Sequence, residues 1–326
     1  MRLSIVKLTV IFCLLLFLAA AHERQQHLGI DSTTRMFYDS FRRMLEPAQL
    51  QANECQSHID FPWEKLRSYS ASSRRAALDT VVARCRCERV DDKLVLTSSF
   101  PAGVDADEQL FSMSIARYRL TNEKGEAVKL KPSVCTTGFG YEPAYPFRGD
   151  ESGSTDANGA SRVTVSASTL LEGTPANVSG ALSVSCKLAT AFDYVRLTRQ
   201  HVGKNIRLGS TTLRLLSMDK VSAVVKVVSG RGDFDYLITR SNNLPYRNGI
   251  TSSIKLAQQD YDYLVSVKDF TLEAFAPYFQ KNRERLLRKD SVKELTVIKS
   301  EGEIVNLYLY KVSTSIEQVF VLPISA

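Results

Sequence analysis

The sequence lacks the motifs by which the common enzyme classes are recognised. It contains no G-x-S-x-G of hydrolases, no G-x-x-x-x-G-K-[ST] of nucleotide enzymes and no H-E-x-x-H of zinc proteases. Histidine is scarce, with 4 residues in 326. The nearest approach to a zinc motif is His22 with His27, where one residue too many separates the histidines to place both on one helix face. The sequence therefore predicts no enzyme and no cofactor.

Long apolar runs are missing everywhere except at the N-terminus. There Arg2 and Lys7 are followed by an apolar run over 8–18, and three alanines at 19–21 supply the small residues of a cleavage site. The run is shorter than the roughly 20 residues that a membrane-spanning helix needs. We therefore expect a cleaved signal peptide over 1–21, a secreted or periplasmic protein, and no transmembrane segment after cleavage.

Charge of one sign is not concentrated in this chain. The formal net charge is +7, and loss of Arg2 and Lys7 with the signal peptide lowers it to +5. The densest basic stretch is 281–289, and no aromatic residues alternate with a basic stripe. We expect no nucleic-acid partner and at most weak contact with acidic surfaces.

Cysteine is sparse, and its number becomes odd after export. The chain has 6 cysteines, and Cys13 leaves with the signal peptide, so at least one of those that remain is unpaired within the chain. We predict a disulfide between Cys135 and Cys186, which occupy neighbouring β-like stretches, and a second disulfide from Cys55 to either Cys85 or Cys87. Zinc is disfavoured, because a single residue separates Cys85 from Cys87.

The first part of the mature chain, 22–89, is predicted to be a helical N-terminal segment. Asp31 and Ser32 can cap a helix that Pro47 ends, and a second helix is expected from Trp63 or Lys65 to Val82.

From residue 90 onward, the pattern changes to short stretches rich in Val, Leu, Ser and Thr that are separated by Gly, Asn and Pro turns. This pattern predicts a mainly β protein with two antiparallel immunoglobulin-like sandwich domains, over 90–200 and 201–326. In the first domain we expect strands at 93–100, 110–120, 128–134, 162–166, 181–187 and 194–198. In the second we expect strands at 205–208, 211–216, 223–228, 234–239, 250–256, 261–267, 294–299 and 305–312.

Two local features refine the second domain. The Glu301-Gly302 turn predicts a hairpin between 294–299 and 305–312, and the only expected helix is 272–288, which Pro277 should break or delay. An aromatic-Asp-Tyr-aliphatic pattern at 192–195, 234–237 and 261–264 predicts a recurrent strand opening.

The tripeptide Arg-Gly-Asp occurs twice, at Arg148-Gly149-Asp150 and at Arg231-Gly232-Asp233. It resembles the integrin-recognition tripeptide of extracellular adhesion proteins, and the first copy, in a polar Gly and Ser stretch, suits an exposed loop better. Asn177 begins an Asn-Val-Ser sequence that accepts a glycan if the host is eukaryotic.

These observations predict an exported, non-enzymatic binding or assembly protein of the periplasm or cell exterior. Loops and exposed sheet edges would contact a protein partner at the cell envelope or exterior. One alternative is an adhesin that uses the loop with Arg148, Gly149 and Asp150. Another is a thiol-dependent enzyme centred on Cys55 with His58, or on Cys85 and Cys87.

Overall fold

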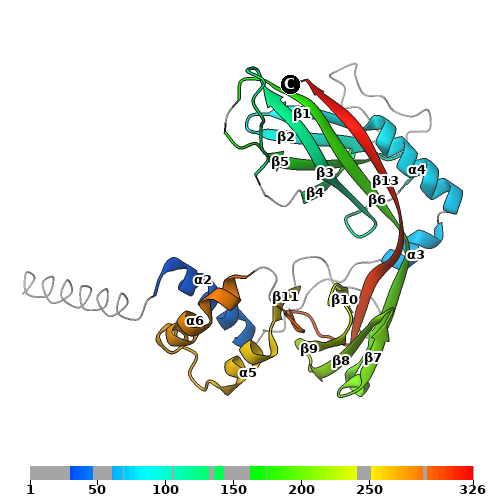
Figure 1. Cartoon of the computed structure of the whole chain (residues 1–326). Helices are drawn as coiled ribbons and strands as arrows, with labels where there is room; N and C mark the ends of the chain where they lie inside the picture. The colour runs from blue at the N-terminus through cyan, green and yellow to red at the C-terminus, as the bar shows by residue number, and fades with distance from the viewer. Residues whose placement is uncertain are drawn as a thin grey trace, which may run out of the picture. The chain divides into compact units, whose positions relative to one another are not determined.

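The computed structural model describes residues 30–46, 61–68, 70–104, 106–131, 136–142, 162–173, 175–240, 251–288 and 292–325 (Figure 1). The protein is mainly β, with strands in 49% and helices in 26% of the described residues, and its strand pairs are antiparallel. The predictions of a mainly β chain and of antiparallel sheets are confirmed. The immunoglobulin-like type of sandwich is not confirmed.

The chain forms two compact units, and neither is continuous in sequence. Unit 1 consists of Met1–His58 and Tyr194–Leu309, and unit 2 consists of Ile59–Asp193 and Tyr310–Ala326. Two long strands, β6 (Val178–Leu197) and β13 (Asn306–Ser325), contain the points at which the chain passes from one unit to the other.

Unit 2 is built from two sheets and one long helix. Strands β1 (Arg86–Val90), β2 (Lys93–Ser99), β5 (Arg162–Leu170) and β4 (Thr136–Glu142) form one sheet in that order. In a second sheet, β13 and β6 are followed by β3 (Phe111–Asn122) at its edge. The inward residues of both sheets share one apolar core with helix α4 (Ala71–Arg84), which adds Leu78 and Val81.

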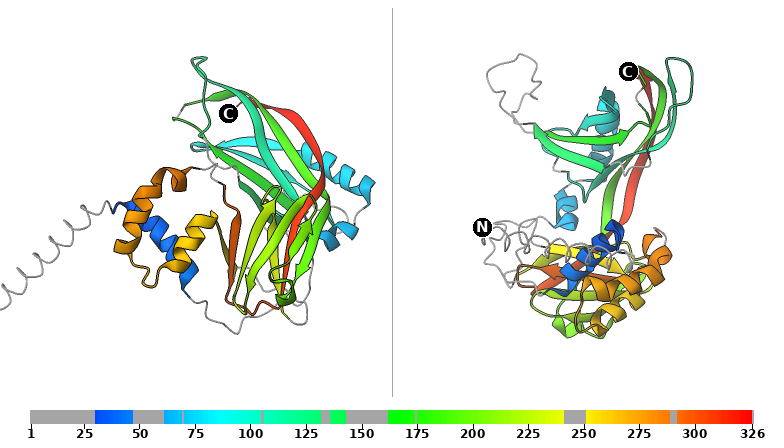
Figure 2. Two further views of the ribbon diagram at one scale, coloured as in Figure 1. Left: turned by 60° about the horizontal axis from the view of Figure 1, so that its bottom comes forward. Right: turned by 90° about the vertical axis from the view of Figure 1, so that its left-hand side faces the viewer.

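Unit 1 is built around a five-stranded sheet. Its order is β11 (Thr251–Leu256), β12 (Leu295–Ser300), β9 (Ser222–Ser229), β8 (Thr211–Met218) and β7 (Asn205–Leu208). Side chains alternate between two cores, because Ala223 and Val225 of β9 enter one and Val224 enters the other. The core that includes Val224 is covered by helices α2 (Ser32–Leu45), α5 (Gln258–Ser266) and α6 (Leu272–Leu287), which lie together in Figure 2. The other core also receives Ile238 of β10 (Asp235–Thr239).

Side-chain caps mark the first residues of α2 and α4. Asp31 accepts a hydrogen bond from the backbone N–H of Thr34 at 2.7 Å, so the predicted cap of α2 is confirmed. The second predicted helix is divided into α3 (Pro62–Lys65), a 3₁₀ turn η1 (Leu66–Ser68) and α4, which Ser70 caps. Helix α4 ends at Arg84, so β1 already starts inside the segment that we predicted to be helical.

The prediction of a strand over 261–267 is wrong. The segment forms α5, in which the buried Asp260 and Leu264 lie one turn apart on the same face. Tyr and Val favour a strand locally, but contacts from Asp260 to distant residues of α6 hold the helix. The aromatic-Asp-Tyr-aliphatic pattern is therefore a strand feature in β6 and β10 but not here.

The predicted hairpin at Glu301-Gly302 is also wrong. Strand β12 pairs with β9 and β11, so both of its edges are occupied, and β13 joins a different sheet. The connecting segment instead donates to the β8–β9 turn, from the N–H of Ser300 to the carbonyl of Val221 at 2.9 Å and from the N–H of Ile304 to Lys220 at 2.7 Å.

Two smaller expectations need correction. The strand predicted at 128–134 is reduced, within 128–131, to an isolated bridge at Leu130, and 132–134 lie outside the described residues. Helix α6 runs unbroken from Leu272 to Leu287 with Pro277 inside it. Pro277 is exposed, so water can reach the carbonyl of Glu273 that loses its partner, while the buried Phe275 and Phe279 hold the helix to the core.

Candidate functional site

The candidate site is the open edge of β3 in unit 2. Strand β3 pairs with β6 on one side and is the last strand of its sheet (Figure 1). An edge strand presents a row of backbone N–H and C=O groups to which another extended chain can pair.

The two ends of this edge are covered. At one end, Met113 donates its N–H to the hydroxyl of Thr137 at 3.2 Å, and the same hydroxyl donates to the carbonyl of Met113 at 3.3 Å. At the other end, the carbonyl of Leu120 accepts from the N–H of Val128 at 2.9 Å. Because N–H and C=O groups alternate between the two sides of a strand, those of Tyr118 point to the same side as those of Leu120. Within the described chain, no backbone group pairs with this side of β3 between Met113 and Leu120.

A hollow of ≈ 800 Å³ accompanies this open stretch. Its wall is mainly apolar, and none of its lining residues is acidic. The hydroxyl of Tyr118 accepts from the N–H of Leu130 at 3.3 Å, which positions that ring at the hollow. The lining is formed by the five residues 115–119, by Leu130 and Lys131, by Thr169, by 181–183 and by Val321.

A β-bulge lies in the middle of the open edge. The register of β3 against β6 shifts between Ile115 and Arg117, so that Tyr118 pairs with the fully buried Leu182. Bulges bend a strand and redirect its side chains, and they are frequent next to binding sites. Sequence reasoning missed this site although a signal was present: apolar residues occupy odd positions up to Ile115 and even positions from Tyr118, a change of phase that marks an inserted residue.

The three described cysteines are free thiols, so neither predicted disulfide is present in the structure. Cys186 faces the core opposite Met113, whose sulfur lies 4.0 Å from that of Cys85. Burial raises the pKa of Cys85 and of Cys87 to about 11 and that of Cys186 to about 12. These thiols are therefore protonated near neutral pH, which gives no support to Cys85 or Cys87 as a nucleophile. Cys55, His58 and Cys135 lie outside the described residues.

The two Arg-Gly-Asp copies differ in what can be said of them. Arg148, Gly149 and Asp150 lie outside the described residues, so the adhesin hypothesis stays a prediction. In the second copy, Arg231 and Asp233 are exposed, and two backbone carbonyls are bonded: that of Arg231 accepts from Thr211 at 2.9 Å and that of Gly232 from Lys255 at 3.1 Å.

Asn177 is exposed immediately before β6. Its N–H donates to the carboxylate of Glu123 at 3.3 Å. The side chain is accessible to modification, and glycosylation remains a prediction.

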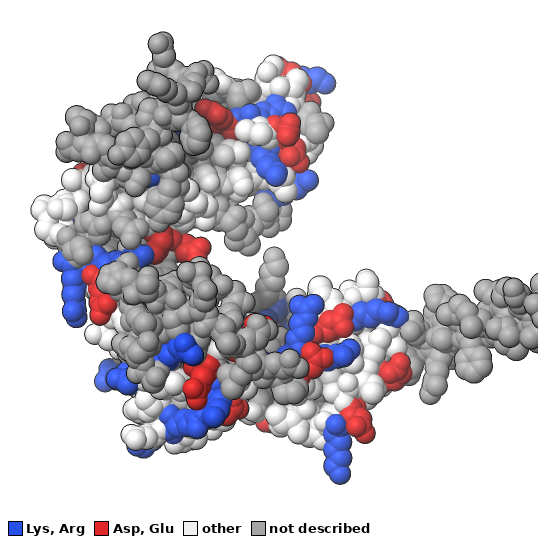
Figure 3. Space-filling view, turned by 180° about the vertical axis from the view of Figure 1, so that it is seen from behind, with Lys and Arg blue, Asp and Glu red and all other residues white. Residues whose placement is uncertain are grey.

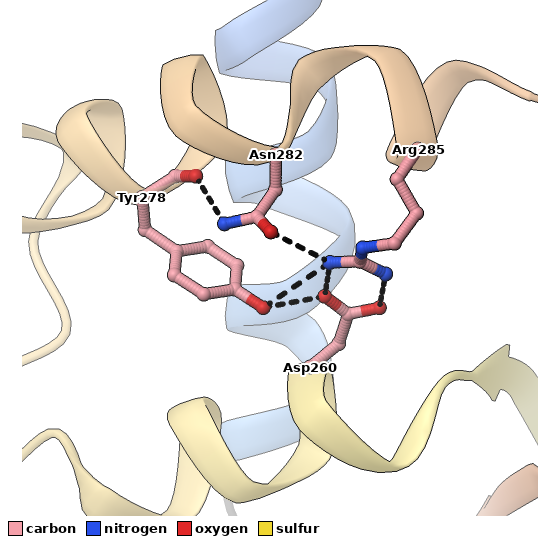
Figure 4. A network of polar contacts seen from close by, with 4 residues as sticks. All are labelled: Asp260, Tyr278, Asn282 and Arg285. Atoms are coloured by element: carbon pink, nitrogen blue, oxygen red, sulfur yellow. Dashed lines mark hydrogen bonds and ion pairs between the residues drawn. The ribbon is translucent and has the colours of Figure 1, made fainter.

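Unit 1 contains a partly buried polar network between α5 and α6, centred on the buried Asp260 (Figure 4). Arg285 binds both oxygens of Asp260, at 2.7 Å and 2.5 Å, and Tyr278 donates to the same carboxylate at 2.6 Å. Burial and the Asp260 carboxylate raise the pKa of Tyr278 above its usual range, so the phenol keeps its proton. Asn282 accepts a further hydrogen bond from Arg285 at 3.3 Å. Because these groups satisfy one another, the network joins two helices and offers no reactive group.

Two arginines of the basic stretch at 281–289 are engaged in contacts within unit 1. Arg283 forms an ion pair with Asp31 at 2.7 Å and lies over the ring of Phe279, and Arg285 belongs to the network above. On the face drawn in Figure 3, Lys and Arg residues are interspersed with Asp and Glu residues in each unit. This distribution gives no support to an extended basic surface.

Comparison with protein-family models, with curated proteins and with solved structures finds no match to this chain. No helix among the described residues is long and apolar enough to cross a membrane. The same residues contain no group of three or more His, Cys, Asp or Glu side chains that could hold a metal ion. The edge of β3, with its hollow, is therefore the candidate binding site of the described residues.

Proposed function

We propose that this chain is an exported, non-enzymatic binding or assembly protein that holds its protein partner at the open edge of β3. The observation that carries the proposal is the ≈ 800 Å³ hollow beside backbone groups that have no partner strand among the described residues. Strand addition supplies affinity through main-chain hydrogen bonds and specificity through pockets for alternate side chains. Export is supported by the signal-peptide pattern over 1–21 and places the partner at the cell envelope or exterior.

An immunoglobulin-like sandwich remains our proposal for the fold type of unit 2. It is supported by two antiparallel sheets that share one apolar core.

A matched pair of substitutions tests binding at this edge. Tyr118→Pro removes the outward N–H that an added strand needs, whereas Tyr118→Ala removes the same ring but keeps the N–H. A photo-crosslinking residue is placed at Ala116, within the bulge, and at Arg86 on the edge of the other sheet as a control. The protein is then irradiated with the envelope or extracellular fraction of its host.

We expect a defined adduct from position 116 and none from position 86. The adduct should persist with Tyr118→Ala and fall at least tenfold with Tyr118→Pro, because one strand hydrogen bond and its register are lost. Circular dichroism of both variants checks that unit 2 is folded. Equal adducts from both positions, or equal adducts with Pro and Ala, would contradict the proposal.

A further inference from the structure

Two arginines stand beside the open edge without partners in the described chain. Arg117 and Arg119 are exposed, and neither guanidinium has a hydrogen bond or ion pair among the described residues. The Lys131 side chain, at the same hollow, is also without one. By contrast, Arg74, Arg84 and Arg89 of the same unit bond to backbone carbonyls.

The two arginines project from one face of the sheet. Tyr118 pairs with the buried Leu182, so its neighbours Arg117 and Arg119 lie on the opposite, outer face. Their cross-strand partners are the small residues Ser183 and Ala181. Small partners on β6 leave the guanidinium groups free to reach toward a strand added on the other side of β3.

The geometry points to an acidic, extended peptide segment as the occupant of this edge, an inference that rests on the proposed function. An added strand places alternate side chains on the two faces of the sheet. Those on the outer face lie beside Arg117 and Arg119, where the negative charge of Asp or Glu complements the positive charge of the guanidinium groups. Those on the inner face meet Tyr118, Leu130 and Leu182, where apolar side chains fit. The segment recognised is therefore one in which acidic and apolar residues alternate.

A second copy of this chain does not fit the same edge. Antiparallel pairing of two β3 edges about Tyr118 places Arg117 of each copy opposite Arg119 of the other. Like charges directly opposite destabilise a strand pair, and charged edges with bulges are a common means of preventing self-association. The arginines thus exclude the identical chain and admit an acidic one.

Three fluorescent peptides test the inference with the full mature chain. In each peptide, Val alternates with one other residue, which is Glu in the first peptide, the uncharged Gln in the second and Lys in the third. Each peptide is about eight residues long, enough to cover the open stretch at about 3.3 Å per residue. Dissociation constants are measured by fluorescence anisotropy at low and at high salt.

We expect the Glu peptide to bind about tenfold more tightly than the Gln peptide at low salt, with the difference reduced at high salt, and the Lys peptide to bind most weakly. The double variant Arg117→Glu with Arg119→Glu should reverse this order and favour the Lys peptide. The matched control is Arg86→Glu, an exposed arginine on the edge strand β1 of the same unit, which should leave the order unchanged.

Each contrary outcome has a definite meaning. Equal binding of all three peptides, or an order that the double variant leaves unchanged, overturns the acidic preference while edge binding stands. Failure of every peptide to bind overturns the inference, and the crosslinking experiment at Ala116 decides separately whether the edge binds any partner. Self-association in sedimentation that the double variant removes would assign the edge to a second copy instead.

Discussion

The role of a cysteine in this protein depends more on its surroundings than on the chemistry of its thiol. Cys85, Cys87 and Cys186 carry potentially reactive thiols, yet all three contribute to the core of unit 2. Their burial suppresses the thiolate, so their role is that of small apolar side chains.

This burial predicts low thiol reactivity in the native protein. With a pKa raised from 9.0 to about 11, the thiolate fraction of Cys85 at pH 8 is about 100-fold below that of an ordinary cysteine. We expect iodoacetamide to label Cys85, Cys87 and Cys186 rapidly in concentrated urea and very slowly in the native state, as measured by peptide mass spectrometry. Rapid native labelling of Cys85 or Cys87 near neutral pH would revive the thiol-enzyme hypothesis.

The same shift has a consequence for stability. Above pH 9 the unfolded chain loses thiol protons that the folded chain keeps, so these groups make the free energy of unfolding fall as the pH rises from about 9 toward 11.

At the level of elements, contacts between distant segments determine what the local sequence leaves open. Helix α5 is joined to α6 by the contact of Asp260 with Arg285, 25 residues further along the chain. The carboxylate is almost fully buried, while the Arg285 side chain is 28% exposed. Removal of the Asp260 charge should therefore lower the free energy of unfolding, because the Arg285 guanidinium stays partly desolvated without its counter-charge.

We predict that Asp260→Asn lowers the free energy of unfolding of unit 1 by about 2–4 kcal/mol, below the upper range for buried pairs because Arg285 is partly exposed. Asp262→Asn is the matched control: it lies two residues away on the same helix and is exposed, so it should cost less than about 0.5 kcal/mol. Urea unfolding followed by circular dichroism measures both. Equal costs for the two variants would show that the network does not stabilise the helix pair.

The sequence predicts the elements that depend on local patterns and fails for those that depend on distant neighbours. The strands of unit 1 from β7 to β9 were predicted because their alternation is local, and Asp31 identified the start of α2. The hairpin at Glu301-Gly302 was mispredicted because a turn sequence carries no information on whether β9 and β11 already occupy the edges of β12. The site was overlooked for a related reason. A bulge at Ala116 shifts the apolar pattern of β3 by a single residue. Whether this bulge lies on an open edge depends on which strands pair with β3, and the local sequence does not tell that.

At the level of the molecule, the units depend on sequence segments that are far apart. The last strand, β13, supplies Ile316, Phe320, Leu322 and Ile324 to the core of unit 2. Ile324 is buried and the other three are partly buried, so together they stabilise the folded state by less than the roughly 6–12 kcal/mol of four fully buried side chains, which is still a large share of the net stability of a domain.

We therefore predict that truncation after Leu309 abolishes cooperative unfolding of unit 2 and makes it sensitive to proteolysis, while removal of only Ser325 and Ala326 has little effect because Ser325 is exposed. Limited proteolysis with mass spectrometry reads out each unit separately. Protection of the fragment 86–193 after the longer truncation would show that β13 is dispensable.

The passage of the chain through β6 and β13 also sets the order of events during biosynthesis. Residues 294–309 complete unit 1 and 310–326 complete unit 2, so both units acquire their final strands from the end of the chain. Folding cannot proceed from the N-terminus one unit at a time, as it does in proteins with consecutive domains. Both units therefore stay incomplete until residues 294–325 have been synthesised. Until those residues are made, β9 and β11 lack their shared neighbour β12, and β6 and β10 lack β13, so their edges are open to pairing with other chains.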